Sequence, residues 1–376
     1  MRRFIWSCAA ICALFVLVAA TAPRSQTQQV PKLTERGLSK ASYVALAKKW
    51  QEHIDRYGET AEALVNLGMA YHYSGEIEAA VRAAERAVEL EPENPKALAF
   101  AGKILGVEGE RTDEAEKLLV KCREIAPDYE DALTSLVSIY LRRGELKRAD
   151  EIFKTIFDRR MIRRPLQDYA YNMLVGLPRG AVLITNGDND TFPPIALQAG
   201  MGFRDDVVVI NRHLLEIEPF AEALFERNPA IRPDRVPDEG DGKIRARKLL
   251  EQIVEEEKAP VYFAVSVPLG QLGFELEHEI EGINMRAAGE GLGAAEAADL
   301  ILERYRLDSA TDWNFAWDLY PSIAQLFRNC VVAMIKHSQL DGVEAETRDR
   351  LLERALQIAE FHDMTGEIGY IGKLLK

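Results

Sequence analysis

A short polar loop that directly follows an apolar run carries the residue types best suited to chemistry. Residues 181–195 read AVLITNGDNDTFPPI, in which Asp188 and Asp190 stand two residues apart among amides and a threonine. Two carboxylates at this spacing can supply hard oxygen ligands to Mg²⁺, Mn²⁺ or Ca²⁺, and an amide or hydroxyl can complete the coordination shell. Asp188 and Asp190 are therefore candidate metal ligands.

The elements around this loop must position it, and they predict a βαβ unit. Residues 181–185 and 206–211 are short apolar runs rich in β-branched residues, which is typical of buried strands. Because a proline disfavours the α conformation in the residue before it, we expect Phe192 and Pro193 to be extended and Pro194 to open the next helix. In such a unit the first loop lies at the carboxyl edge of a parallel sheet, where ligands commonly bind.

The second strand should bring further polar residues to the same edge. Arg212 could pair with a phosphate, and His213 is a candidate catalytic acid or base. The candidate ligand-binding residues are Asn186, Asn189, Thr191, Asn211 and Arg212. The alternative is turn chemistry, because such side chains also form tight turns and bond the exposed amides before a helix. Both interpretations stay open.

The composition is that of an acidic globular protein. With 376 residues, 47% of them hydrophobic and 28% charged, the chain is long enough for two or three domains with real cores. A net charge of −13 argues against nucleic acid or an anionic lipid surface as a partner. The basic cluster within residues 159–164 is too short to change that expectation.

The amino terminus has the layout of a secretory signal. Residues 1–22 hold two arginines, an apolar segment and a small-residue end, so we expect an extracytoplasmic protein of the periplasm or cell envelope. Pro23 would hinder cleavage, which leaves an uncleaved membrane anchor as the alternative. After a polar linker over residues 23–40, only Cys122 and Cys330 remain in the mature chain, and we expect buried free thiols.

A period near 34 residues runs through residues 61–163. Equivalent positions in the first two copies are Gly68 and Gly102, Ala80 and Ala115, and Pro92 and Pro127. This spacing resembles the tetratricopeptide repeat family, in which small residues let paired helices touch and a proline closes each unit. With a leading helix over residues 41–57, the resemblance implies three helical pairs and a concave face that binds a protein or peptide.

The resemblance also implies which side chains face the partner. The partner-groove candidates are Val65, Met69, His72, Lys96, Lys103 and Ser138. Val65 and Met69 stand where the family's clamp for chaperone tails has lysine and asparagine, so that ligand is not implied. The alternative is that the repeats only brace the next domain.

A second resemblance covers residues 164–337. The runs TNGDNDTFP, DVVVIN, PVYFAV, EIEGINMR and WDLY resemble the soluble carboxyl-terminal region of bacterial multi-spanning membrane proteins related to protein O-mannosyltransferases. Sugar transfer in that family belongs to the membrane-spanning half, so glycosyl transfer is not implied for this region. Pro194, Arg212 and His213 depart from the family pattern.

The remaining chain predicts an α/β domain closed by helices. Further strands are expected at residues 261–265 and 279–286, and helices at 166–174, 214–227, 243–258, 294–305, 320–337 and 344–361. The expected domains are a signal or anchor (1–22), a linker (23–40), an α-helical repeat array (41–163), an α/β domain with a short, mainly parallel sheet (164–310) and carboxyl-terminal helices (311–376).

Three functions follow from these patterns. The first is an exported binding or scaffold protein with tetratricopeptide repeats, serving envelope glycosylation or assembly. The alternative is a divalent-metal-dependent enzyme of glycosyl or phosphoryl transfer that uses the loop at residues 187–191. A calcium-stabilised structural module without turnover is the third.

Overall fold

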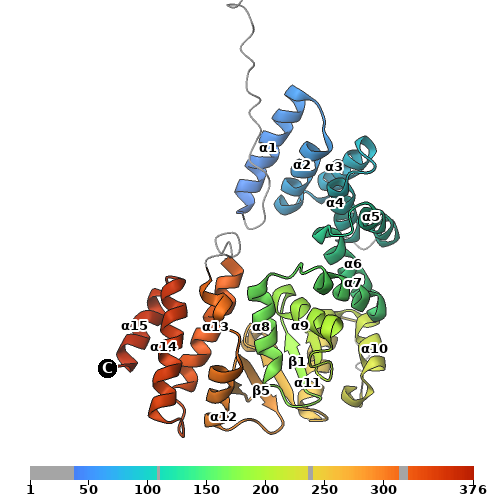
Figure 1. Ribbon diagram of the computed structural model, residues 1–376. Helices are drawn as coiled ribbons and strands as arrows, with labels where there is room; N and C mark the ends of the chain where they lie inside the picture. The colour runs from blue at the N-terminus through green and yellow to red at the C-terminus, as the bar shows by residue number, and fades with distance from the viewer. Residues whose placement is uncertain (1–37, 108–110, 236–239, 313–320) are drawn as a thin grey trace, which may run out of the picture. The chain divides into compact units, whose positions relative to one another are not determined.

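The computed structural model describes residues 38–107, 111–235, 240–312 and 321–376 (Figure 1). The chain forms two compact units, Met1–Pro92 and Glu93–Lys376. The predicted signal and most of the predicted linker lie outside the described residues. Within the described ranges, no helix has the length and apolar character needed to cross a membrane.

The described part of the first unit is a set of three helices. They are α1 (Lys40–Tyr57), α2 (Ala61–Ser74) and α3 (Ile77–Leu90). The side chains of Ser39 and Thr60 accept hydrogen bonds from the first turns of α1 and α2 and so cap them. Gly75, at φ 90°, ends α2 in the left-handed conformation that glycine favours. The helix predicted over residues 41–57 and the first helical pair are confirmed.

The second unit begins with two more helical pairs. They are α4 (Pro95–Val107) with α5 (Thr112–Ile125), and α6 (Glu130–Arg142) with α7 (Leu146–Asp158). A Cβ atom on Gly102 would lie 2.5 Å from Cγ of Leu119, so glycine lets α4 and α5 approach closely. Cys122 and Cys330 are buried free thiols, as predicted, and burial raises the pKa of Cys122 to about 11.

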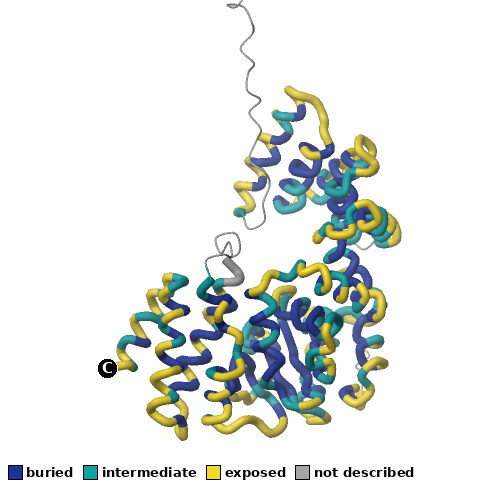
Figure 2. Tube along the Cα trace, viewed as in Figure 1, coloured by how far each residue is buried: buried dark blue, intermediate teal, exposed yellow. Residues whose placement is uncertain are grey.

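A five-stranded sheet follows, in the order β2-β1-β3-β5-β4. The strands are β1 (Val182–Thr185), β2 (Val208–Asn211), β3 (Val261–Ala264), β4 (Glu279–Glu281) and β5 (Asn284–Ala288). β1 pairs in parallel with β2 and with β3, which confirms the predicted βαβ unit. Every residue of β1 and β3 is buried, and Figure 2 shows this buried core as the dark strands at the centre of the second unit.

The fourth predicted strand, at residues 279–286, is an antiparallel hairpin instead. β4 and β5 pair with each other, and β5 pairs antiparallel with β3, so the sheet is mixed. Gly282 occupies the turn at φ 61°, where a Cβ atom would lie 2.0 Å from the Tyr305 hydroxyl oxygen. The chain reverses there because glycine tolerates both the left-handed backbone and the crowding.

The helix between β1 and β2 starts earlier than predicted. α9 (Asp188–Met201) begins directly after Gly187, and Pro193 and Pro194 lie inside it rather than before it. A proline inside a helix cannot donate to the carbonyl four residues earlier. Both prolines fall close to the first turn, where side-chain capping holds the helix together, and this explains the difference.

Helices complete the second unit. They are α8 (Arg164–Val175), η1 (Leu214–Glu216), α10 (Glu218–Arg227), η2 (Pro229–Ile231), α11 (Gly242–Glu255), η3 (Leu269–Gln271), α12 (Ala294–Asp299), the π-helical turn η4 (Leu300–Arg304), η5 (Asp308–Thr311), α13 (Pro321–His337), α14 (Ala345–Phe361) and α15 (Thr365–Leu374). α13 and α14 pack on each other as the predicted hairpin. α15 was not predicted.

The third helical pair is built into the α/β domain. α7 packs along α9, and a Cβ atom on Gly200 would lie 2.1 Å from the Phe157 ring. On the other side, a Cβ atom on Gly144 would lie 2.3 Å from the Pro219 carbonyl oxygen at the start of α10. These two close approaches fix the hairpin against two helices of the domain.

Candidate functional site

The candidate loop lies where the parallel strands end. β1, β2 and β3 run in one direction, so their carboxyl ends share one edge of the sheet. The first turn of α9 also reaches this edge. It brings Asp190 and Thr191 to residues that follow or end the three strands.

Asp190 is a capping residue in this structure. Its side chain is only 3% exposed. Oδ1 accepts a hydrogen bond from the Gly187 amide at 2.7 Å, and Oδ2 accepts from the Asn186 amide at 2.9 Å and from the Ser266 hydroxyl. Both oxygens are therefore engaged by the loop and by the end of β3, as the turn-chemistry alternative expects.

Thr191 and Asn211 form a second, buried part of the same network. The Thr191 hydroxyl lies 2.6 Å from the Thr185 hydroxyl, donates to the Gly187 carbonyl at 2.6 Å, and accepts from Asn211 Nδ2 at 3.1 Å. Asn211 Oδ1 in turn accepts from the His213 amide at 2.9 Å. Because the polar atoms satisfy one another, the network ties the ends of β1 and β2 to α9.

Asp188 and Asn189, by contrast, are exposed at the start of α9. Among the residues that the structure describes, no group of three or more His, Cys, Asp or Glu side chains is arranged to hold a metal ion. A cation at Asp188 would have to complete its shell largely with water or with a bound substrate. The metal role of Asp188 and Asp190 stays a prediction.

The polar residues after β2 point to local partners. Arg212 Nε donates to Asn186 Oδ1 at 2.7 Å, which ties the β2 end to the candidate loop. His213 is exposed, and its Nδ1 lies 3.1 Å from Glu216 Oε1 in η1. The structure thus joins Asn186 to Arg212, whereas the His213 ring contacts Glu216 in the following turn. A catalytic role for His213 stays a prediction.

The partner-groove candidates divide between the two units. In the first unit Met69 and His72 are half-buried, but Val65 is 1% exposed and belongs to the core, so it cannot face a partner. In the second unit Lys96 and Lys103 are half-buried, and the exposed Ser138 donates back to the Thr134 carbonyl. Sequence periodicity places a residue on a helix face, but the packing of neighbouring helices decides whether that face is open.

The second unit holds a cavity of about 490 Å³ that the sequence did not predict. Its walls come from α6 and α7, from α9, from β2 and from α10. Such a volume lies in the range of ligand pockets. Asp150 of α7 and Arg227 of α10 form an ion pair of 2.9 Å in its wall, and burial raises the pKa of Asp150. These elements are far apart in sequence, so no local pattern signals the cavity.

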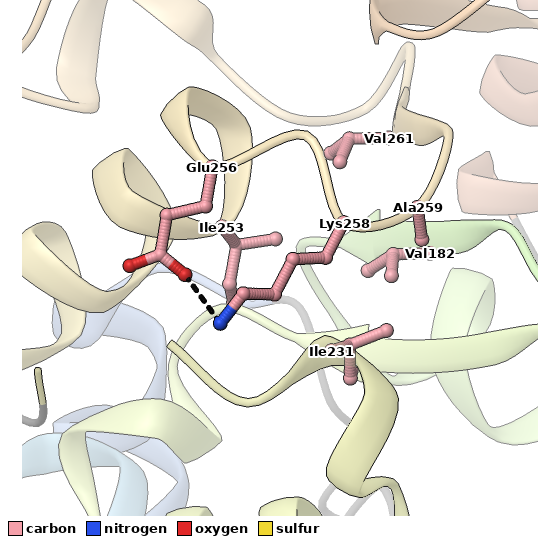
Figure 3. A pocket seen from close by; sticks show the side chains of 7 residues that line it. All are labelled: Val182, Ile231, Ile253, Glu256, Lys258, Ala259 and Val261. Carbon is pink, nitrogen blue, oxygen red and sulfur yellow. Dashed lines mark ion pairs between the residues drawn. The ribbon is translucent and has the colours of Figure 1, made fainter. Parts of the chain in front are cut away.

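A smaller cavity lies at the opposite, amino end of the parallel strands. Its volume is about 10 Å³, space for one water molecule at most (Figure 3). Glu256 and Lys258 form an ion pair of 2.9 Å beside it, and its other walls are apolar. This is a packing gap and offers no room for a ligand.

Two stretches of the chain match known families. Residues 61–94 match the tetratricopeptide repeat, and this stretch contains α2 and α3. Residues 166–228 match TMEM260-associated domain 2, and this stretch runs from α8 through the candidate loop to α10. The second match agrees with the resemblance of this region to the soluble part of O-mannosyltransferase-like membrane proteins.

The chain was also compared over its whole length with curated proteins and with solved structures. No curated protein matches the chain. A crystal structure of a tetratricopeptide repeat protein from Parabacteroides merdae is similar over 84% of this chain and 93% of that chain, with 12% identity and a TM-score of 0.32. A TM-score of 0.32 is too low to assign a common fold to the two chains. The chain carries tetratricopeptide repeats, which generally bind protein partners, followed by an α/β region similar to TMEM260-associated domain 2.

Proposed function

We propose that this chain is an exported scaffold that holds a protein partner through its helical repeats and serves envelope glycosylation or assembly. The observation that carries the proposal is the series of helical pairs, the first of which matches the tetratricopeptide repeat. Repeat pairs of this kind expose one helix of each pair along a binding surface. The half-buried Met69 and His72 on α2 can contact a partner there.

Charge supports a protein partner. The net charge of −13 repels nucleic acid and anionic lipid, whereas Lys96 and Lys103 on α4 add local positive charge. These two lysines lie on one helix face because residues seven apart are two turns apart. An acidic or amide-rich segment of a partner suits them best.

The amino-terminal pattern supports export. Residues 1–22 carry the signal layout, and residues 164–337 resemble the soluble region of bacterial multi-spanning membrane proteins related to protein O-mannosyltransferases, which supports a place at the cell envelope. Protease protection in intact cells and in spheroplasts tests this part. The full chain should become accessible to protease once the outer envelope is opened. A chain protected until the inner membrane is lysed would overturn export.

Photocrosslinking from single positions tests the partner. A photoreactive amino acid at Met69, His72 or Lys103 in the full chain should yield a discrete adduct in cells, which mass spectrometry identifies. The same amino acid at Glu353, exposed on α14, is the matched control. An envelope protein trapped from the repeats but not from Glu353 supports the scaffold. Equal yields from all positions, or no adduct, contradict it.

A further inference from the structure

One edge of the sheet is open at β2. β2 is the first strand in the sheet order and pairs only with β1 among the described strands. The amide of Val208 donates to the Ala181 carbonyl at 2.9 Å, and that of Arg212 donates to the Thr185 carbonyl at 3.0 Å. Since alternate residues of a strand direct their peptide groups to opposite sides, Val209 and Asn211 direct theirs toward the open edge.

The open edge presents the peptide groups of Val209 and Asn211. In the described part of the chain, no hydrogen bond engages the amide or carbonyl of Val209 or the amide of Asn211. Val207, two residues before Val209, already has hydrogen-bond partners. Its amide donates to the Arg204 carbonyl at 3.0 Å, and its carbonyl accepts from Gln198 Nε2 at 2.7 Å. Val209 as a whole residue is only 8% exposed, and a peptide group without a partner is unfavourable where water has little access to it. The edge therefore favours a ligand that offers backbone-like donors and acceptors.

The 490 Å³ cavity lies along this same edge. Val207, Val209 and Asn211 line it, together with residues of α7, α9 and α10. In Figure 1, α10 lies on the side of β1 opposite to β5, which is the side of β2 in the sheet order. Space for an added chain thus exists beside the unpaired strand. Phe153, Phe220 and Leu224 supply apolar walls for side chains of that chain.

The charges around the cavity select a basic occupant. Asp150 is paired with Arg227, and Lys154 with Asp158 at 3.0 Å. Two further acids, Glu151 and Asp205, line the cavity from exposed positions, and neither forms an ion pair with another residue that the structure describes. The charge left at the opening is therefore negative, and it complements lysine or arginine.

We propose that this cavity binds an extended segment of a partner protein, which adds as a new strand to the open edge of β2. Its backbone bonds Val209 and Asn211, alternate apolar side chains enter the cavity, and flanking basic residues meet Glu151 and Asp205. The site goes beyond the proposed function, because it uses none of the repeat faces assigned above. The crosslinking experiment at Met69 and His72 therefore tests the scaffold independently of this site.

A labelled peptide in which valine and lysine alternate is the probe, and fluorescence anisotropy with the full chain is the assay. We expect saturable binding. A peptide with the same sequence but N-methylated at alternate amides keeps the charge and loses the strand hydrogen bonds, so it should bind about tenfold more weakly or worse. Equal binding of the two peptides, or no binding of the first, overturns the proposal.

Variants of the chain locate the site. Val209→Pro removes the open-edge amide while leaving the ladder to β1 intact, and should weaken binding about tenfold. Ala199→Phe, which narrows the cavity from α9, tests the same site without touching the sheet and should weaken binding similarly. Glu151→Lys should weaken binding, whereas the charge-matched Glu353→Lys on α14 should not. Unchanged binding in Ala199→Phe, or equal loss in Glu353→Lys, refutes the location.

Hydrogen exchange of the unaltered protein gives an independent readout. Strand addition should slow exchange of the β2 amides that are open in the free chain, those of Val209 and Asn211. The amides of Val208 and Ile210, which already bond β1, should change less. Protection confined to other segments would show that the peptide binds elsewhere and would overturn the proposal. A second copy of this chain as occupant would appear as a dimer that the peptide dissociates, which also contradicts a partner segment.

Discussion

Replacing Asp190 by alanine separates the capping role of the loop acids from the metal role. Asp190 accepts hydrogen bonds from the Asn186 amide, the Gly187 amide and the Ser266 hydroxyl, and it is buried. A hydrogen bond to a charged group contributes about 1.5–3 kcal/mol, and bonds to one carboxylate are not additive. We therefore expect Asp190→Ala to lower the free energy of unfolding by about 3–5 kcal/mol.

Asp188→Ala is the matched control. Asp188 is exposed in the first turn of α9, where the interaction of a carboxylate with the helix dipole contributes about 0.3–1 kcal/mol. Both losses in the free energy of unfolding are measured by urea unfolding of the full chain in the presence of a chelator, monitored by circular dichroism. If Asp190→Ala loses less than about 1 kcal/mol, or no more than Asp188→Ala, the capping role derived from the structure is wrong.

The same titrations with Mg²⁺, Mn²⁺ or Ca²⁺ test the metal role. A cation at a hundred times its dissociation constant would stabilise the folded chain by about 2.7 kcal/mol. If a cation stabilises the original chain and neither variant, the loop is a cation site. If no cation changes the midpoint while Asp190→Ala still unfolds earlier, the acids act in turn formation and capping.

Three further predictions concern the second unit. Gly144→Ala should lower the urea midpoint by an amount equivalent to at least about 1–2 kcal/mol, because φ is 69° and the new Cβ meets the Pro219 carbonyl. Stability should fall as pH drops below about 6.5 because of His337. Burial lowers its pKa, so the unfolded state takes up the proton first, and the Gly282 amide bonds Nε2 only in the neutral ring. Stability should fall again between about pH 4 and pH 2, because the hydrogen bond from Arg204 lowers the pKa of Asp206 to about 2.

Each of these predictions has its own check. Gly144→Ser should lower the urea midpoint as much as Gly144→Ala does. An unchanged midpoint in both variants would show that the turn relaxes to accept a side chain. The slope of the urea midpoint from pH 7.5 to 5 should shrink in His337→Gln, and an unchanged slope would assign the titration to another group. Asp206→Asn should already be less stable than the original chain at neutral pH. Its stability should then fall less on acidification than that of the original chain.

The parallel strands could be predicted from sequence because they are apolar on both faces. Residues 181–184, 207–210 and 261–265 are continuous apolar runs, and no tertiary information is needed to interpret them as buried strands. The start of α9 could not be read in the same way. Local rules place Pro193 and Pro194 at a boundary, but capping by Asp190 stabilises a helix that begins five residues before Pro193.

The candidate site was predicted in part. Sequence identified Asn186, Thr191 and Asn211, and the structure brings these residues to one sheet edge. Ser266 was missed, although it follows β3 as Asn186 follows β1, so the rule that parallel strands end together could have found it. The cavity beside β2 depends on helices from distant parts of the chain, and only the tertiary structure reveals it.

The close packing at Gly144 and Gly200 has a consequence for how the repeat array can change in length. A tandem array ordinarily gains or loses units freely, because each unit contacts only its neighbours. Here the hairpin of α6 and α7 is pinned by backbone-level approaches to α9 and α10, so no unit can be inserted between it and the α/β domain without losing them. Duplication or loss of repeats upstream of α6 would leave these approaches intact. The hairpin of α6 and α7 would keep its packing against the α/β domain whatever the number of repeats before it.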